Sequence, residues 1–129
     1  MSRSVRSVAD PGFSPSVRGG EGDAPAPRNQ QWERALARAI EGRVLVELIY
    51  ERETAARSFA PQAMFWSPQG GVNVTGLQLF DAAAPVIAGE VRDFEVGRVR
   101  LVRLTERQHD LPPIDREAAK YRGGIVCAL

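Results

Sequence analysis

Residues 43–53 read RVLVELIYERE, and their apolar side chains follow the two-residue period of a β-strand. One face of such a strand would be wholly apolar, whereas the other would carry two glutamates. The apolar face comprises Val44, Val46, Leu48 and Tyr50, and the other Leu45, Glu47, Ile49 and Glu51. Since one strand cannot bury a face alone, this segment predicts a sheet with a covering element.

A short amphipathic helix is predicted directly before this strand. Asn29 is a favourable N-cap, and Gly42 is the residue type expected just beyond a helix C-terminus. Glu33 falls on the charged side of this helix, which we expect to face solvent. Because so short a helix is marginal alone, it must pack on the sheet. Its apolar stripe comprises Trp32, Ala35, Leu36, Ala39 and Ile40.

Further strands are predicted downstream, with turns between them. The segment RSFAPQAMFW (57–66) contains Pro61, which cannot donate to a ladder and marks a bend or an edge. Residues 67–71, SPQGG, supply a turn before VNVTGLQLF (72–80), so these two strands should form a hairpin. A last long strand is expected from about Arg92 to Thr105. The fold class is therefore mainly β: a small, strongly bent sheet or barrel with one N-terminal helix.

The 129 residues allow one domain with one core. Residues 1–28 are rich in Ser, Gly and Pro without a period, which predicts a disordered tail. Residues 29–106 hold the helix and the strands. Residues 107–129 end in the apolar IVCAL, so we expect this extension to pack on the sheet as an added strand, or on a second copy of the chain in a homodimer.

The charge balance excludes a bulk binder of nucleic acid, since 17 Lys and Arg residues face 16 Asp and Glu. Any basic site must be local. The single cysteine, Cys127, excludes an internal disulfide and a cysteine-based zinc site. No apolar run approaches the length of a membrane span, and the first residues lack a secretory apolar core. The sequence thus predicts a soluble, cytoplasmic protein.

Catalytic motifs are missing from the sequence, which contains no HExxH, phosphate-binding glycine loop or nucleophile elbow. Asp93 and Glu95 share a strand face without a metal-ligand partner. His109 lies in a proline-flanked loop and is expected to be solvated. We therefore predict no catalytic residue, no metal ligand and no cofactor, and the chain is not expected to be an enzyme.

Arginines crowd the segment RDFEVGRVRLVRL, residues 92–104. Strand alternation directs Arg98 and Arg100 one way and the apolar residues between them the other. A one-residue bulge near Val102 would then place Arg103 with the arginines. Two interpretations remain open: the arginines pair with glutamates on a solvated outer face, or some of them hold an anion.

Over residues 39–106 the chain resembles the WYL-domain family of bacterial regulators. An ordered series of features carries the resemblance: a strand ending in Tyr50, the step from Arg57 to Pro61, the turn at Gly70 and Gly71, the strand VNVTGLQL, and Arg92-x-Phe94 followed by Arg98-Val99. The tripeptide Trp-Tyr-Leu that names the family is replaced here by Val72, Asn73 and Val74.

The resemblance implies an Sm-like or SH3-like small barrel whose basic positions, Arg57, Arg92 and Arg98, converge on one mouth and hold an anion. It further implies a ligand-sensing or nucleic-acid-binding regulatory module for a nucleotide or single-stranded nucleic acid. Tyr50 would either only line the rim or touch the ligand, and the Gln78 amide would be satisfied by backbone or by ligand. The alternative function is a protein-interaction subunit that regulates a partner.

Phe65 and Trp66 lie together at a strand end, where they could either stack bases or close the barrel.

Overall fold

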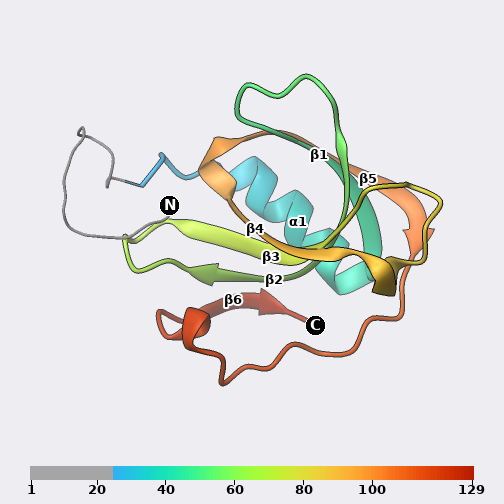
Figure 1. Ribbon diagram of the computed structural model, residues 1–129. Helices are drawn as coiled ribbons and strands as arrows, with labels where there is room; N and C mark the ends of the chain where they lie inside the picture. Colours follow the sequence, from blue (N-terminus) through green and yellow to red (C-terminus); the bar gives the residue numbers. More distant parts are fainter. Residues whose placement is uncertain (1–24) are drawn as a thin grey trace.

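The computed structural model describes residues 25–129, which form a mainly β fold of one α-helix and a six-stranded antiparallel sheet that curves around the helix (Figure 1). The prediction of a disordered tail falls mostly on residues 1–24, which lie outside the described residues. Within residues 25–129, no helix combines the length and apolar character needed to cross a membrane.

The sheet has the strand order β4-β3-β2-β1-β5, and β6 pairs with β2 beside β1. Short 3-10 turns, η1 to η3, interrupt the connections. The elements are α1 (Gln30–Gly42), β1 (Val44–Tyr50), β2 (Arg57–Trp66), β3 (Val72–Leu79), η1 (Val86–Ala88), β4 (Glu90–Glu95), η2 (Val96–Arg98), β5 (Val99–Gln108), η3 (Ala119–Tyr121) and β6 (Ile125–Ala128).

The start of α1 is confirmed, since the Asn29 side chain accepts a hydrogen bond of 3.2 Å from the Trp32 amide. Its end differs from the expectation, because Arg43 and not Gly42 adopts the left-handed conformation, with φ 55°. The Arg43 guanidinium donates to the Leu111 carbonyl at 2.9 Å, a contact that helps to hold this residue in place.

Glu33 was expected to face solvent, and this was wrong: the residue is buried. Arg28, which precedes the helix, donates to its carboxylate through Nε at 3.1 Å and Nη2 at 2.7 Å. The bidentate partner satisfies the charge, so the carboxylate can be buried against the helix. Residues 25–28, assigned to the tail on composition, therefore contact the folded part.

The inner face of the sheet, defined as the face that packs on α1, carries the main core. Its buried side chains form one cluster in which the apolar face predicted for β1 lies against the helical stripe. Trp32 and Ala35 are half-buried at the margin of this cluster. The buried members are Leu36, Ala39, Ile40, Val46, Leu48, Phe59, Met64, Val72, Val74, Phe94, Val96, Val99 and Val102.

The outer face, on the opposite side of the sheet, is covered by residues 109–129. This extension runs along β2 at the bottom of Figure 1 and returns as β6. It buries two small clusters, one around Leu111 and the other around Tyr121. The sheet residues beneath them are Leu45, Ala60, Leu77 and Leu79 in the first cluster and Ala63 and Phe65 in the second.

Pro61 marks a bend and not an edge. Strand β2 is central: β3 pairs along its length, β1 pairs with its first half and β6 with its second. The register with β3 shifts between Pro61 and Ala63, so the missing N–H coincides with an irregularity in the ladder.

The single long strand expected from Arg92 to Thr105 was wrong, because η2 divides it into β4 and β5. The bulge also lies elsewhere than predicted. Tyr50 pairs with Val99 and Ile49 with Leu101, so the extra residue is Arg100 and not Val102. This bulge lets the valines at 99 and 102 both reach the core.

Candidate functional site

Four residues from four strands form one cluster near the inner face of the sheet, with the aromatic ring of Phe94 at its centre. The Phe94 ring, on β4, lies 5.0 Å from the Tyr50 ring between centroids, and the Arg57 guanidinium carbon lies 5.3 Å from the Phe94 centroid. Gln78 joins them through a hydrogen bond to Arg57. We refer to Tyr50, Arg57, Gln78 and Phe94 as the Phe94 cluster.

Strand pairing explains why these residues meet. Leu48 pairs with Arg57, so the arginine shares the inner face of that core leucine. Phe59, two residues further along β2, pairs with Gln78. Since paired residues point to the same side of an antiparallel sheet, Arg57 and Gln78 lie on the inner face, at the border of the core.

Arg57 is half-buried, and all three of its donor nitrogens have partners. Nε and Nη2 both bind the carboxylate of Glu53, with Nε at 2.9 Å, and Nη1 donates to the Gln78 Oε1 at 2.6 Å. The hydrogen bond to Glu53 raises the pKa of Arg57, and the same bond lowers the pKa of Glu53. The Gln78 carbonyl is thus satisfied by an arginine, a partner that sequence reasoning did not consider.

Tyr50 contributes a hydroxyl that has a free proton within the described part of the chain. Its oxygen accepts a hydrogen bond of 3.4 Å from the Glu95 amide. Burial of the ring raises the pKa of Tyr50 to about 12, so the phenol stays neutral at ordinary pH. A neutral phenol that accepts one hydrogen bond can still donate another to a ligand oxygen.

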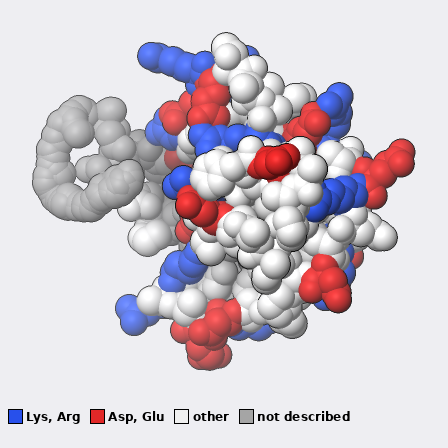
Figure 2. Space-filling model, turned by 45° about the vertical axis from the view of Figure 1, so that its right-hand side comes forward, with Lys and Arg blue, Asp and Glu red and all other residues white. Residues whose placement is uncertain are grey.

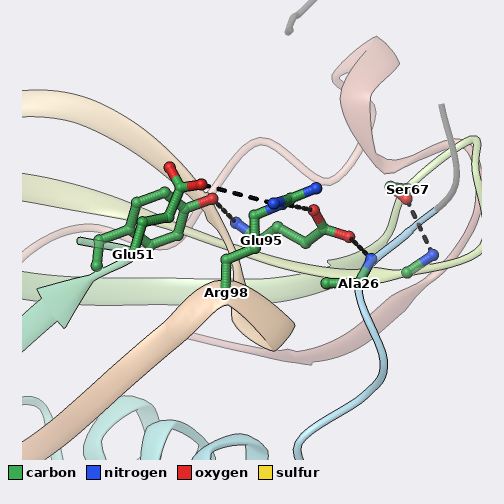
Figure 3. A network of polar contacts seen from close by, with 7 residues as sticks. Ala26, Glu51, Ser67, Glu95 and Arg98 are labelled. Carbon is green, nitrogen blue, oxygen red and sulfur yellow. Dashed lines mark hydrogen bonds and ion pairs between the residues drawn. The ribbon is translucent and has the colours of Figure 1, made fainter. Parts of the chain in front are cut away.

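Arg98 lies beside the Phe94 cluster, since it binds Glu95, whose amide donates to the Tyr50 hydroxyl. Its Nε donates to Glu95 at 2.8 Å, and its Nη1 lies 3.5 Å from a carboxylate oxygen of Glu51. The second oxygen of Glu95 accepts from the Ala26 amide at 2.7 Å, as Figure 3 shows. The acid therefore links this arginine to the chain that enters α1.

Arg92 binds a different acid from the other two arginines. It pairs with Gly76 on β3 and so shares the inner face with Gln78. Its guanidinium binds Glu90 at 3.3 Å, and Glu90 in turn pairs with Gln78 on β3. The structure thus brings Arg57 and Gln78 into direct contact and joins Tyr50 to them through the Phe94 ring. It connects Arg98 to Tyr50 through Glu95, and Arg92 lies two residues before Phe94 on β4.

Two further residues shape the site without having been predicted as part of it. Glu53 lies in the turn after β1 and occupies the fork of Arg57. Arg100, the bulge residue, donates to the carbonyls of Glu51 and Glu53 at 2.9 and 3.1 Å and so fastens that turn. The only sequence signal for the first contact is the four-residue spacing of Glu53 and Arg57, which lies outside any helix.

The charges around the site balance. Three cations, Arg57, Arg98 and Arg100, face three carboxylates, Glu51, Glu53 and Glu95. The face of the molecule in Figure 2 likewise shows charges of both signs interspersed around a broad uncharged area. An anion would therefore have to displace a carboxylate and would not meet a field of one sign.

Other candidate residues have structural surroundings. Phe65 is buried edge-to-face against Tyr121, with centroids 5.1 Å apart, and the guanidinium of Arg28 lies 4.9 Å from the Trp66 ring centroid. Both aromatic rings are thus engaged in packing. Asp93 is bound by Lys120 at 3.1 Å. Among residues 25–129, no three His, Cys, Asp or Glu side chains gather where they could hold a metal ion.

His109 was expected to be solvated, and this was wrong: it is buried. Its Nδ1 accepts from the Leu111 amide at 3.2 Å, and its own amide donates to the Arg43 carbonyl at 2.9 Å. Burial lowers the pKa of His109, and the positive charge of Arg43 acts in the same direction. Nε2 is buried without a hydrogen-bond partner in the described chain.

No protein-family model, curated protein sequence or solved structure matches the chain at a significant level.

Proposed function

We propose that this chain is a ligand-sensing or nucleic-acid-binding regulatory module that takes a nucleotide or single-stranded nucleic acid at the Phe94 cluster. The observation that carries the proposal is the fork of Arg57, which already receives a carboxylate through two nitrogens. A guanidinium that holds a carboxylate in this way matches a phosphate equally well. Phe94 and Gln78 hold the fork in position.

Glu53 acts in this proposal as an internal stand-in for the ligand anion. Its side chain is exposed for 38%, and it belongs to a turn, so it can swing away without disturbing the core. Solvent-accessible ion pairs stabilise a protein by only about 0–1 kcal/mol, which a phosphate can match. The vacated fork, the Tyr50 hydroxyl and Arg98 would then surround the incoming phosphate.

Phe80 supports a ligand that carries a base in addition to phosphate. It directly follows β3, two residues beyond Gln78, and its side chain is exposed for 71%. An exposed aromatic ring beside a phosphate-binding group is the combination by which proteins stack the bases of single strands. We therefore expect nucleotides and single strands to bind better than inorganic phosphate.

The proposal also covers the class of β-barrel and the cellular role of the chain. The antiparallel order, the bulged β5 and the leading helix support a small barrel of the Sm-like or SH3-like kind. A WYL-type regulatory role, action in the cytoplasm and the absence of an enzymatic activity are parts of the same proposal.

A binding titration with four variants tests it. The ligand is a mixed single-stranded oligonucleotide, measured at two salt concentrations and compared with inorganic phosphate. We expect affinity to fall as salt rises, and Arg57→Ala and Arg98→Ala each to weaken binding by about 1–3 kcal/mol. Glu53→Gln should tighten binding, because it removes the competing charge. Arg103→Ala is the matched control, since Arg103 also pairs with a glutamate, Glu47, but projects from β5 away from the cluster.

The proposal fails if the wild type binds no oligonucleotide or nucleotide at low salt. It fails equally if binding survives loss of Arg57 and Arg98 together, or if Glu53→Gln and Arg103→Ala behave alike.

The alternative, a protein-interaction subunit without a nucleic-acid ligand, is favoured by one observation. Ile87 in η1 and Val91 in β4 are exposed for 72% and 63%, and exposed large apolar side chains commonly belong to contact surfaces. Under this alternative, Ile87→Asp would abolish capture of a partner, whereas Arg57→Ala would leave that capture unchanged.

A further inference from the structure

Strand β4 lies at one end of the strand order. Among residues 25–129 its only ladder partner is β3, so the opposite side of its backbone carries no strand. The first four residues of β4, from Glu90 to Asp93, are all exposed. An open strand edge of this kind presents unpaired N–H and C=O groups to another strand.

The direction of these groups follows from one hydrogen bond. The Glu95 amide donates to the Tyr50 hydroxyl, away from β3, so residue 95 has its backbone groups on the open side. Alternation along an antiparallel strand then directs the amides and carbonyls of Asp93 and Val91 to the open side too. The residues between them, including Arg92, bond to β3.

We propose that a second copy of this chain pairs with this edge, β4 against β4, antiparallel about a two-fold axis at Val91. The two sheets would then join into one continuous sheet across the dimer.

Charge selects this register among the alternatives. A two-fold axis normal to the sheet requires that facing residues point to the same side, so the axis must pass between the two copies of one residue and not between neighbouring residues. With Val91 on the axis, Glu90 of each copy lies opposite Arg92 of the other, which makes two complementary pairs. Moving the axis by one residue places Arg92 opposite Arg92, and moving it by two places Asp93 opposite Asp93.

The surroundings of Val91 suit a second copy as well. Val91 pairs with Leu77 and so lies on the outer face, where its side chain is exposed for 63%. The exposed Ile87 belongs to η1, which packs on β3. The axis residue of β4 is a valine and not a lysine or a proline, and the two charges that flank it, Glu90 and Arg92, are opposite in sign and so complement those of a second copy.

Sedimentation of the full chain over a range of concentrations tests the pairing. We expect a monomer–dimer equilibrium in the wild type. Val91→Lys should remove the dimer, and Val91→Pro should do the same, because it deletes an N–H that β3 does not use. Val126→Lys is the matched control, since Val126 is an exposed valine on the other short edge strand, β6, and should leave the dimer intact. Unchanged melting of each variant shows that it is folded.

A charge swap tests the register. Glu90→Arg alone and Arg92→Glu alone should each weaken the dimer about tenfold or more, as expected when like charges face each other twice. The double variant Glu90→Arg, Arg92→Glu should restore it. In a Cys127→Ser background, Val91→Cys should form a disulfide between copies, because directly paired residues have suitable Cα separation.

Three results would overturn the inference: a chain that stays monomeric at every concentration, a dimer that survives Val91→Pro, or a dimer lost on Val126→Lys but kept on Val91→Lys. A chain that stays monomeric would mean that the β4 edge does not bind a second copy and could bind only a strand of another protein. A dimer that is lost only on Val126→Lys would mean that the two copies meet at β6. Since none of these variants changes Arg98 or a residue of the Phe94 cluster, failure of the dimer and failure of ligand binding are separate results.

Discussion

The two faces of the sheet are built by the same strands but covered in different ways. The inner face has one continuous core, to which α1 and five of the six strands contribute. The outer face has two separate clusters beneath residues 109–129, a segment whose only regular elements are η3 and β6. The alternating side chains of a single strand are therefore buried in two different cores, one on each face of the sheet.

Strand β1 shows what this difference teaches. Its inner residues Val46 and Leu48 are fully buried, and their alternation identifies them from sequence. Its outer residue Leu45 is almost as buried, although a glutamate follows two residues later. Burial on the outer face depends on a cover that returns from the end of the chain, and no local period encodes that cover.

The largest effect is expected on the inner face, from Phe59→Ala. Phe59 is fully buried and packs edge-to-face on Phe94 at 5.2 Å between centroids. Removing a buried phenylalanine ring costs about 3–5 kcal/mol, and a continuous core gives the cavity little room to collapse. Urea unfolding measures the loss. Phe80→Ala, at an exposed phenylalanine, should change stability by less than about 0.5 kcal/mol.

Phe65→Ala makes the same change on the outer face. It should cost about 3 kcal/mol, the lower end of the range for a buried phenylalanine. Phe65 is also buried, but its cluster is small and its cover, around Tyr121, can settle into the space. Equal losses for Phe65→Ala and Phe59→Ala, measured by the same urea titration, would show that the two faces are equivalent and would break the comparison.

His109 provides a smaller, pH-dependent effect, since it anchors the outer cover at its start. Burial lowers the pKa of His109 below the value of about 6.5 that it has when unfolded, so the unfolded chain binds the proton more readily. Its stabilising contribution is therefore present above about pH 6.5 and falls as the pH drops through the folded pKa, by up to about 1.4 kcal/mol per pH unit.

Unfolding at pH 7.5 and pH 5.5 measures this dependence. His109→Asn keeps an acceptor for the Leu111 amide but does not titrate, so its stability should differ little between the two values. A wild type that is equally stable at both would mean that His109 does not couple folding to protons.

The smallest effect is expected from Arg103→Ala, on exposed β5. Arg103 pairs with Glu47 across the strands, but its side chain is exposed for 67%. Such a pair contributes about 0–1 kcal/mol, so the melting temperature should hardly move. A loss as large as that of Phe65→Ala would show that the exposed charges carry part of the fold.

Sequence reasoning predicted the elements that local patterns encode: the helix with its Asn29 cap, the alternation of β1 and the hairpin of β2 and β3. It missed features that depend on distant contacts. Glu33 is buried because Arg28 folds back on it, and His109 is buried because the Arg43 carbonyl receives its amide. The bulge at Arg100 could not be located from the spacing of arginines alone.

The same limit applies to the candidate site. The resemblance grouped Arg57, Arg92 and Arg98 as one anion site, with Tyr50 and Gln78 as further candidates, and the strand registers place Arg57 and Gln78 on the same face of the sheet. Their mutual contacts, and the occupation of the Arg57 fork by Glu53, follow from the course of a turn that has no periodic pattern.

The pairing of β2 with both its sequence neighbours and β6 has a consequence for the order of folding. The hairpin of β2 and β3 closes over a short turn, whereas Ala63 on β2 pairs with Ala128, so that contact closes a loop of more than sixty residues. Loop-closure entropy makes such contacts form late. Substitutions that weaken the pairing of β6 with β2 should therefore speed unfolding while leaving the refolding rate nearly unchanged. The contacts of this strand thus control the unfolding rate of the molecule.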